Sequence, residues 1–350
     1  MASDEYVVDF PTLGFLVADW IEAHCPVPKG RWVGRPFVQD GWQLWCTVNH
    51  YRIKTNARWV PEEPILGPAF HNRRSQVMAP QKTGKGPWAG ATSLAEARGP
   101  TLFAGWARAG EAYQCSDHQC DCGFVYEYEV GEPKGMHWPT PNIQIFAASQ
   151  DQVDNTFDPL RGMVQNGPLS QHIRVGLDFA RIGEVGQIAS VTSSALSRLG
   201  NPITFAIFDE SGTYTDTNKL KKVARTARRG LAGMGGRSIE TTNMFDPVEN
   251  STAQETFESP MMDVFKFYRE PPAGLDFKKK ADRAKILRHV YQDSPWVDLE
   301  AIEAEAKELM LKDPQEAERF FGNIRVAGKG SWMPDHLWEN TLSLPEGGAE

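Results

Sequence analysis

The sequence predicts an α/β fold with a mostly parallel sheet, helices on both of its faces and a helical C-terminal tail. Two observations predict this fold. From residue 75 onward, short apolar runs alternate with stretches of helical periodicity, and after residue 270 the chain becomes charged and rich in helix formers. This alternation indicates a sheet that is covered by helices on both faces. Ligands of such sheets bind at the carboxyl ends of the strands, so functional residues are expected there.

The composition is that of a globular protein of 350 residues with 41% hydrophobic residues. We expect a cytoplasmic protein without membrane contact, because no apolar run approaches the roughly 20 residues of a membrane span and the N-terminal residues lack a secretory signal pattern. Five cysteines, an odd number, favour reduced thiols over a disulfide framework. The net charge of −8 argues against a coat of nucleic acid, but it allows contact with DNA through one face.

Before the alternation begins, residues 1–30 are expected to form an N-terminal arm with a short amphipathic helix. A turn then leads into a second helix with Gln43 just inside its start, where a solvent-facing glutamine is the ordinary interpretation. The predicted strands are residues 76–79, 101–104, 143–147, 188–192, 203–208, 238–242 and 262–267. The predicted helices between them are 87–98, 150–165, 216–229 and 250–258.

After the N-terminal arm, this pattern divides the chain into two further segments. Residues 31–270 are expected to form the core, with an insertion near 110–140. Pro271 to Gly274 indicates a linker into a helical subdomain at 271–350. Its predicted helices are 279–292, 296–312 with Asp298 near the cap, and 313–322.

The stretch from Val77 to Gly86 is an apolar run that enters a turn containing glycine and lysine. It approximates the phosphate-binding pattern G-x-x-x-x-G-K-[ST], in which backbone N–H groups and a lysine bind phosphates and a hydroxyl holds Mg²⁺. Ala79 replaces the first glycine and Gly86 replaces the hydroxyl residue. An ordinary surface turn is the alternative. The candidate nucleotide ligands are Gln81, Lys82, Thr83, Gly84, Lys85 and Gly86, with Lys85 as the phosphate lysine.

Two acids, Asp209 and Glu210, end the predicted strand 203–208. Charged groups are seldom placed at the end of a buried strand without a partner. Asp209 is therefore the candidate for Mg²⁺ and Glu210 the candidate base that polarises an attacking water. Thr83 or a water is the candidate for the missing hydroxyl. A helix N-cap with a neighbouring acid is the alternative interpretation of the two acids.

Phosphoryl transfer also uses a cation that stabilises charge on the terminal phosphate. Arg198 and Arg161 are the candidates, and each is also compatible with a plain surface arginine.

A cluster of three thiols and one imidazole lies within eight residues, at Cys115, His118, Cys120 and Cys122. This donor set is that of a structural zinc site. The spacing matches no common zinc finger or ribbon, and four ligands so close in sequence would strain tetrahedral closure. An inserted surface hairpin is the alternative.

Basic residues concentrate in two places, which are usually solvated faces but are available for DNA phosphates. They are Lys219, Lys221, Lys222, Arg225, Arg228 and Arg229 on the predicted helix 216–229, and Lys278, Lys279 and Lys280 after the linker.

In their order along the chain, these motifs resemble the ATPase domain of the large terminase subunit of tailed bacteriophages, which has a P-loop NTPase-type fold. The matching segments are 34–37 with Gln43, 77–85, 147–149 with Gln152, 197–200, 208–210 and 240–243, within roughly residues 30 to 335. This sequence departs from the family at Ala79, at Gln81, where such loops often carry arginine, and at Gly86.

The resemblance implies an ATP- and Mg²⁺-dependent motor that translocates double-stranded viral DNA into a procapsid. It implies a homo-oligomeric ring that works with the portal protein and the small terminase subunit in the host cell cytoplasm. The family's nuclease domain is not expected in this chain. The implied roles are adenine recognition for Gln43, phosphate binding for Lys85, Mg²⁺ binding for Asp209, water activation for Glu210, action across subunits for Arg198, and coupling of hydrolysis to movement for Thr241, Thr242 and Asn243.

Two other functions remain open. One is a non-catalytic assembly and DNA-docking module whose degenerate loop binds nucleotide weakly or not at all. The other is a helicase-like protein or a small-molecule phosphotransferase that uses the same loop.

Overall fold

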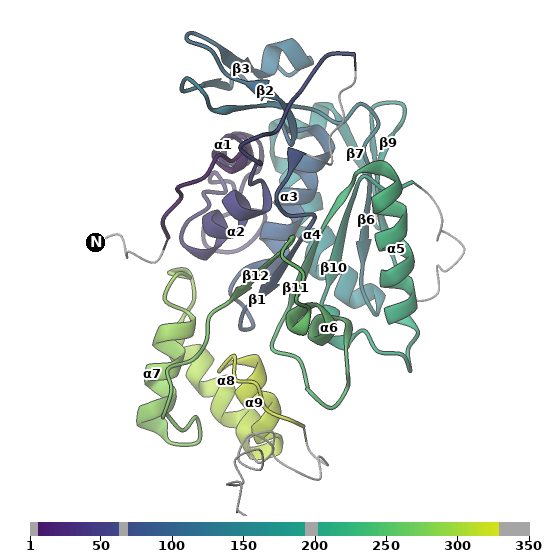
Figure 1. Cartoon of the computed structure of the whole chain (residues 1–350). Helices are drawn as coiled ribbons and strands as arrows, with labels where there is room; N and C mark the ends of the chain where they lie inside the picture. The colour runs from purple at the N-terminus through teal and green to yellow at the C-terminus, as the bar shows by residue number, and fades with distance from the viewer. Residues whose placement is uncertain (1–5, 63–68, 193–201, 329–350) are drawn as a thin grey trace, which may run out of the picture.

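The computed structural model describes residues 6–62, 69–192 and 202–328, and its centre is an eight-stranded sheet (Figure 1). The strand order is β12-β1-β11-β10-β6-β9-β8-β7. All strands from β12 to β9 are parallel, and β8 and β7 add an antiparallel edge. The bounds are β1 (Arg74–Met78), β6 (Asn142–Phe146), β7 (Ile173–Val175), β8 (Phe179–Ile182), β9 (Gly186–Val191), β10 (Phe205–Asp209), β11 (Arg237–Thr242) and β12 (Val264–Tyr268). The predicted mostly parallel sheet is confirmed.

Helices cover both faces of this sheet, as the sequence predicts (Figure 1). On one face, α3 (Lys85–Arg98) and α4 (Gln150–Asn166) pack on the central strands, and α2 (Trp42–His50) packs on β1 and β12. On the other face lie α5 (Leu220–Met234) and α6 (Thr252–Glu258). Alternate residues of β10 therefore enter different cores: Phe205 and Ile207 face α3, whereas Phe208 faces α5.

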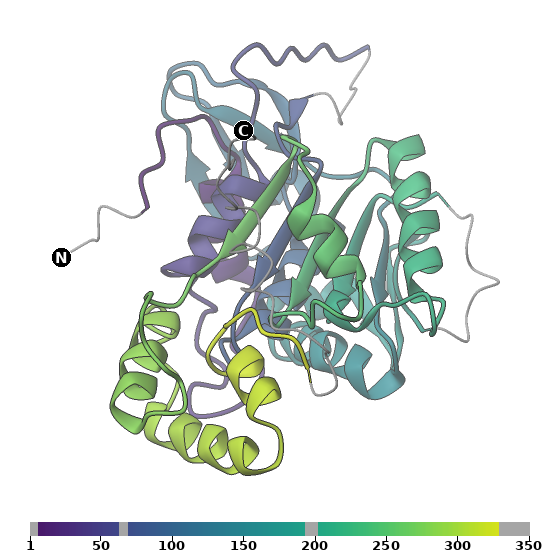
Figure 2. The same ribbon diagram turned by 60° about the horizontal axis from the view of Figure 1, so that its bottom comes forward.

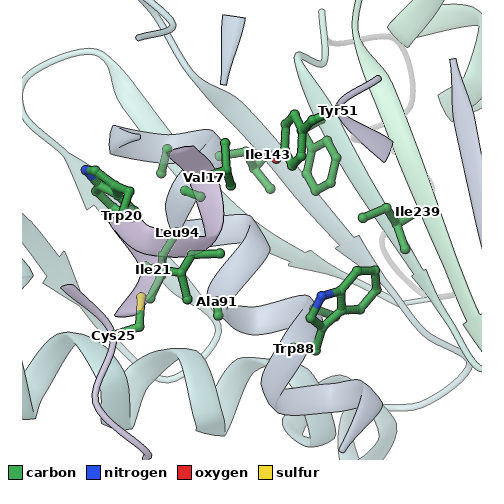
Figure 3. Close-up of a cluster of buried hydrophobic side chains, with 14 of the residues drawn as sticks. Val17, Trp20, Ile21, Cys25, Tyr51, Trp88, Ala91, Leu94, Ile143 and Ile239 are labelled. Carbon is green, nitrogen blue, oxygen red and sulfur yellow. The ribbon is translucent and has the colours of Figure 1, made fainter. Parts of the chain in front are cut away.

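Helix α1 (Gly14–His24) belongs to the larger of these cores. Figure 3 shows Val17, Trp20 and Ile21 of α1 beside Ala91 and Leu94 of α3. The N-terminal segment is thus packed onto the helix that follows β1.

Residues between α3 and β6 form two small antiparallel sheets at one end of the molecule (Figure 1). The predicted strand 101–104 is present as β2 (Leu102–Trp106), but it pairs with β5 (Pro133–Met136) outside the main sheet. The second pair is β3 (Ala112–Gln114) with β4 (Val125–Glu127), and the 3-10 helix η2 (Cys115–His118) lies between them.

The C-terminal helices pack together around a hydrophobic cluster of their own (Figure 2). They are α7 (Lys280–Val290), α8 (Leu299–Lys312) and α9 (Pro314–Phe320). Asp298 caps α8 as predicted, because its Oδ1 accepts hydrogen bonds from the N–H groups of Glu300 and Ala301. Among the helices of the described residues, we find none with the length and apolar character needed to cross a bilayer.

Candidate nucleotide-binding site

The stretch singled out in the sequence folds as a strand, a tight loop and a helix. The loop at 79–84 joins β1 to α3. Gly84 stands at the N-cap of α3 with φ +95°, a left-handed conformation that favours glycine, and Lys82 also has a positive φ of 66°. Because glycine brings no capping side chain, the first N–H groups of α3 are suited to an anion.

Lys85 is buried and folds back over this loop. Its Nζ donates hydrogen bonds to the carbonyl oxygens of Ala79 at 2.7 Å and Pro80 at 2.9 Å, and to Asn243 Oδ1 at 2.9 Å. Burial lowers the pKa of Lys85, and the nearby carboxyl of Glu210 opposes that shift. The ammonium group therefore lies inside the curl of the loop, where a phosphate lysine is expected.

Gly86 is a glycine because helix α4 crosses α3 at this point. A Cβ placed on Gly86 would lie 2.3 Å from the carbonyl oxygen of Asn155, and one on Gly90 would lie 3.0 Å from that of Thr156. No serine or threonine fits at position 86 in this packing. The missing hydroxyl of the phosphate-binding pattern thus has a steric cause.

Two other hydroxyls lie near the loop. The Thr83 hydroxyl donates to the carbonyl oxygen of Pro80 at 2.9 Å, so it is engaged with its own loop. The hydroxyl of Thr156, on α4, donates to Asp209 Oδ2 at 2.9 Å. Thr156 was not found from the sequence, because a single threonine inside a helix gives no local signal.

Asp209 is the last residue of β10 and is buried. Its Oδ1 accepts a hydrogen bond from Thr241 Oγ1 at 2.6 Å, opposite the bond from Thr156. Burial raises the pKa of Asp209, and these hydroxyl donors counter the shift. The carboxylate is held among oxygen groups, the ligand type that Mg²⁺ prefers.

Glu210 follows in the left-handed region with φ +51°. Its Oε2 accepts hydrogen bonds from the backbone N–H of Asn243 at 3.4 Å and from Asn243 Nδ2 at 3.3 Å. Burial raises the pKa of Glu210, and Lys85 acts in the opposite direction. The short 3-10 helix η5 (Ser211–Thr213) begins here. Glu210 thus occupies the N-cap position of η5, but its side chain makes no capping hydrogen bond there.

Strand β11 lies between β1 and β10, so its end separates the loop from the two acids. Thr241 contacts Asp209, and Thr242 accepts a hydrogen bond from the N–H of Gly212 at 3.1 Å. Asn243 contacts both Lys85 and Glu210. All three residues of the predicted coupling segment thus lie within or beside the site.

Gln43 is buried on α2 and lies at the loop, so its interpretation as a solvent-facing glutamine is wrong. A Cβ placed on Gly84 would lie 3.3 Å from Gln43 Nε2 and 3.4 Å from the ring of Trp296.

Residues of the C-terminal helical segment also hydrogen-bond to the loop. The Tyr291 hydroxyl donates to the carbonyl oxygen of Gln81 at 2.9 Å, and the Gln81 N–H donates to the carbonyl oxygen of Phe320 at 2.9 Å.

The candidate arginines have different outcomes. Arg198 lies outside the described residues. Arg161 donates to the carbonyl oxygens of Gly176 and Leu177 and forms an ion pair with Asp158, so it holds α4 to the β7–β8 turn.

The basic face predicted on helix 216–229 is smaller than expected. Lys221 is buried and pairs with Asp216 and Glu255, while Arg228 pairs with the buried Glu240. Two of the six candidates are therefore directed inward. The exposed basic residues include Lys219, Lys222, Arg225 and Arg229, and Lys278, Lys279 and Lys280 after the linker.

The cysteine cluster has a different fourth member from the one expected. Cys115, Cys120 and Cys122 converge on His24 of α1. His118 is not part of the group, because its ring stacks on that of His137 with centroids 3.9 Å apart. The sequence order hid this arrangement, since His24 is 91 residues away from Cys115.

Comparison with known proteins adds sequence relatives and a structural neighbour, while no protein-family model matches the chain. The chain is 26% identical over 305 residues to the Gene 13 protein of Mycobacterium phage D29, across 75% of this chain and 46% of that protein. It is 24% identical over 298 residues to the Gene 13 protein of Mycobacterium phage L5, across 73% of this chain and 44% of that protein. The chain thus spans about half the length of these relatives.

One structural neighbour is the large terminase of bacteriophage HK97. Its crystal structure superposes with a TM-score of 0.61 at 17% identity, across 90% of this chain and 55% of that one. The sequence resemblance is confirmed at the level of the fold: the chain has the fold of the matching part of a bacteriophage large terminase.

Proposed function

We propose that this chain is the ATP-hydrolysing motor domain of a viral DNA-packaging terminase. One observation carries the proposal: Lys85, Asp209, Glu210 and Asn243 form one connected site at the carboxyl ends of β1, β10 and β11. Phosphate lysine, metal-binding acid and water-activating acid are three of the parts that phosphoryl transfer uses in a protein. The terminase fold supports the same function.

In this proposal, the phosphates of ATP bind at the N-terminus of α3, where Gly84 leaves backbone N–H groups available. Lys85 exchanges its bonds to the Ala79 and Pro80 carbonyls for bonds to phosphate oxygens. Gln43, beside Gly84, hydrogen-bonds the adenine ring. The Tyr291 and Phe320 contacts hold Gln81, so the loop is ordered before nucleotide arrives.

Asp209 is the residue that would hold Mg²⁺, and the hydroxyls of Thr156 and Thr241 orient its carboxylate. When bound, Mg²⁺ neutralises charge that develops on the phosphates. Glu210 orients and polarises the attacking water, and Asn243 fixes its carboxylate. Arg198 of a neighbouring subunit would supply the further positive charge.

The wider role follows from the family resemblance. The proposed substrate is double-stranded viral DNA, moved into a procapsid by a homo-oligomeric ring on the portal protein, together with the small terminase subunit, in the host cell cytoplasm. Thr241, Thr242 and Asn243 would transmit hydrolysis to movement, because they contact both acids and the turn after β10.

Steady-state ATP hydrolysis with and without Mg²⁺ tests the proposal. We expect Mg²⁺-dependent hydrolysis that falls about 10²- to 10⁴-fold in Glu210→Gln, the range for loss of a general base. Lys85→Ala should fall about 10²- to 10³-fold, as expected for loss of one charge-stabilising donor. The exposed residues Glu305 and Lys312 provide matched controls as Glu305→Gln and Lys312→Ala. Unchanged hydrolysis in Glu210→Gln would overturn the site assignment.

A non-catalytic docking module is the second candidate, and the packing at Gly86 favours it. That packing leaves no room for the hydroxyl that usually holds Mg²⁺. A chain of this kind would bind ATP weakly or not at all and would not hydrolyse it. Equilibrium binding of a fluorescent ATP analogue, measured beside hydrolysis in the presence of DNA, separates the two. Weak or absent binding with no turnover supports the docking module, and saturable binding with turnover supports the motor.

A further inference from the structure

His24, Cys115, Cys120 and Cys122 form a compact group whose four ligand atoms lie within 4.8 Å of one another. The Nε2 atom of His24 lies 3.5 Å from Cys115 Sγ, 3.6 Å from Cys120 Sγ and 3.1 Å from Cys122 Sγ. Tetrahedral zinc with bonds of about 2.3 Å to sulfur and 2.0–2.1 Å to nitrogen separates these atoms by about 3.5 Å. The distances from His24 Nε2 to the three sulfur atoms are therefore close to those of a tetrahedral site.

The tautomer of His24 also suits a metal. Its Nδ1 lies 2.7 Å from the carbonyl oxygen of Trp20, an atom that only accepts hydrogen bonds. Nδ1 must therefore carry the proton, and the lone pair of Nε2 faces the three sulfur atoms. Metal-bound histidines are oriented by their second ring nitrogen in this way.

A neighbouring backbone group directs a donor at one of the sulfurs. The N–H of Phe124 donates to Cys122 Sγ at 3.4 Å. Arg98 lines a small cavity with His24, Cys115 and Cys120, and so brings positive charge to the group. Such contacts stabilise thiolates, the form of cysteine that binds metals.

We propose that these four residues form a structural zinc site that fastens helix α1 to the insertion between α3 and β6. The Cys₃His donor set selects zinc, and four protein ligands leave no coordination position for a substrate. Binding releases the protons of the three thiols, so the occupied site carries a net charge of −1 beside Arg98. Four ligands within eight residues would strain a tetrahedral site. This strain is relieved here, because His24 comes from a distant helix.

This site goes beyond the proposed ATPase and can be tested without measuring hydrolysis. The full chain, purified with a reducing agent, should contain one zinc ion per molecule by plasma mass spectrometry. After zinc is removed with a chelator, Co²⁺ should bind at the same stoichiometry, with the absorption bands of tetrahedral thiolate coordination. Absence of both zinc and a thiolate–cobalt spectrum would overturn the proposal.

Matched variants identify the ligands. Cys120→Ser and His24→Gln should lower the affinity for Zn²⁺ at least tenfold in a competition with a chromogenic chelator. His118→Gln tests the histidine inside the sequence cluster, and Cys46→Ala tests a buried cysteine of α2. Both should keep the wild-type affinity. If His118→Gln loses zinc and His24→Gln keeps it, the assignment of the fourth ligand is overturned.

One measurement on the wild-type chain does not depend on variants that fold. Removal of zinc should increase hydrogen exchange of backbone amides in η2 and in the last turn of α1, because the metal links these segments. Exchange in β10 and β11 should change little, since they lie in the main sheet. Unchanged exchange at both linked segments would argue against a metal that fastens them.

Discussion

The ammonium group of Lys85 donates a hydrogen bond to the side-chain oxygen of Asn243 at 2.9 Å. The amide nitrogen of the same asparagine lies 3.3 Å from Glu210 Oε2 and donates to it. The amide offers an acceptor to the cation and a donor to the anion at once, which a carboxylate cannot do. The end of β11 therefore links the proposed phosphate lysine to the proposed water-activating acid.

Asn243→Asp should impair turnover more than nucleotide binding. The substitution keeps the shape of the side chain, but it places a carboxylate beside Glu210 and removes the amide donor. A hydrogen bond to a charged group contributes about 1.5–3 kcal/mol, so we expect kcat to fall about tenfold or more. Asn218→Asp is the matched control, because the exposed Asn218 also loses an amide donor, its bond to the Thr213 carbonyl oxygen at 2.8 Å, outside the bridge between Lys85 and Glu210. An unchanged kcat in Asn243→Asp would contradict the role of this bridge.

Gly86→Thr restores the usual phosphate-loop pattern, yet it should harm the protein. The new Cβ would collide with the Asn155 carbonyl, 2.3 Å away, and overpacking of this kind costs about 1–3 kcal/mol. Urea unfolding should show that loss, and ATP hydrolysis should fall. Gly233→Thr on α5 is the control, since a Cβ there meets no atom of the described residues within 4 Å. A Gly86→Thr variant as stable as the wild type would show that α3 and α4 can separate.

The strands of the parallel sheet could be predicted because most are short runs rich in apolar or β-branched residues, a signal contained in a few neighbouring residues. The short antiparallel strands gave no such signal. Strand β4, for example, is Val125–Glu127, and its residues are mostly exposed. Strand β2 was found, but its pairing with β5 was not, because pairing depends on residues distant in sequence.

The candidate site also contains residues that the sequence indicates and residues that it does not. Lys85, Asp209 and Glu210 follow predicted strands, so position and residue type together indicate them. Thr156 and Tyr291 reach the site only through the packing of α4 and the C-terminal helices, and no motif marks them. His24 joins the cysteines for the same reason.

Asp209→Asn should stabilise the chain in the absence of metal and nucleotide. Burial raises the pKa of Asp209 above its ordinary value of 3.8, so the folded state keeps a proton that the unfolded state has released. The free energy of unfolding of the wild type therefore falls as pH rises from 3.8 through the folded-state pKa. The neutral variant avoids this loss. The two proteins should converge in acid and diverge towards neutral pH.

Urea unfolding at a series of pH values checks this difference. Saturating Mg²⁺ and ATP should reverse the order at neutral pH, because ligand binding then stabilises the wild type more than the variant. A variant that is less stable than the wild type at every pH without ligand would contradict the prediction.

Gln43→Ala should reduce the preference for ATP over GTP. Gln43 lies beside Gly84 at the start of α3, and loss of one hydrogen bond to adenine removes about 0.5–1.5 kcal/mol. We expect KM for ATP to rise about two- to tenfold, with little change in KM for GTP. An equal change for both nucleotides would indicate that Gln43 supports the loop and does not read the base.

Tyr291→Phe should weaken nucleotide binding from outside the loop. The substitution keeps the buried ring but removes the hydroxyl that donates to the Gln81 carbonyl at 2.9 Å. The loop then loses a hydrogen bond to the C-terminal helical segment. The free energy of ATP binding should weaken by about 0.5–1.5 kcal/mol, the contribution of one hydrogen bond. Tyr128→Phe is the matched control, because its hydroxyl accepts a hydrogen bond from Gly135 N–H within the insertion. Calorimetric titration should show weaker ATP binding for Tyr291→Phe alone, and equal affinities in both variants would mean that the C-terminal helices pack against the loop without shaping it.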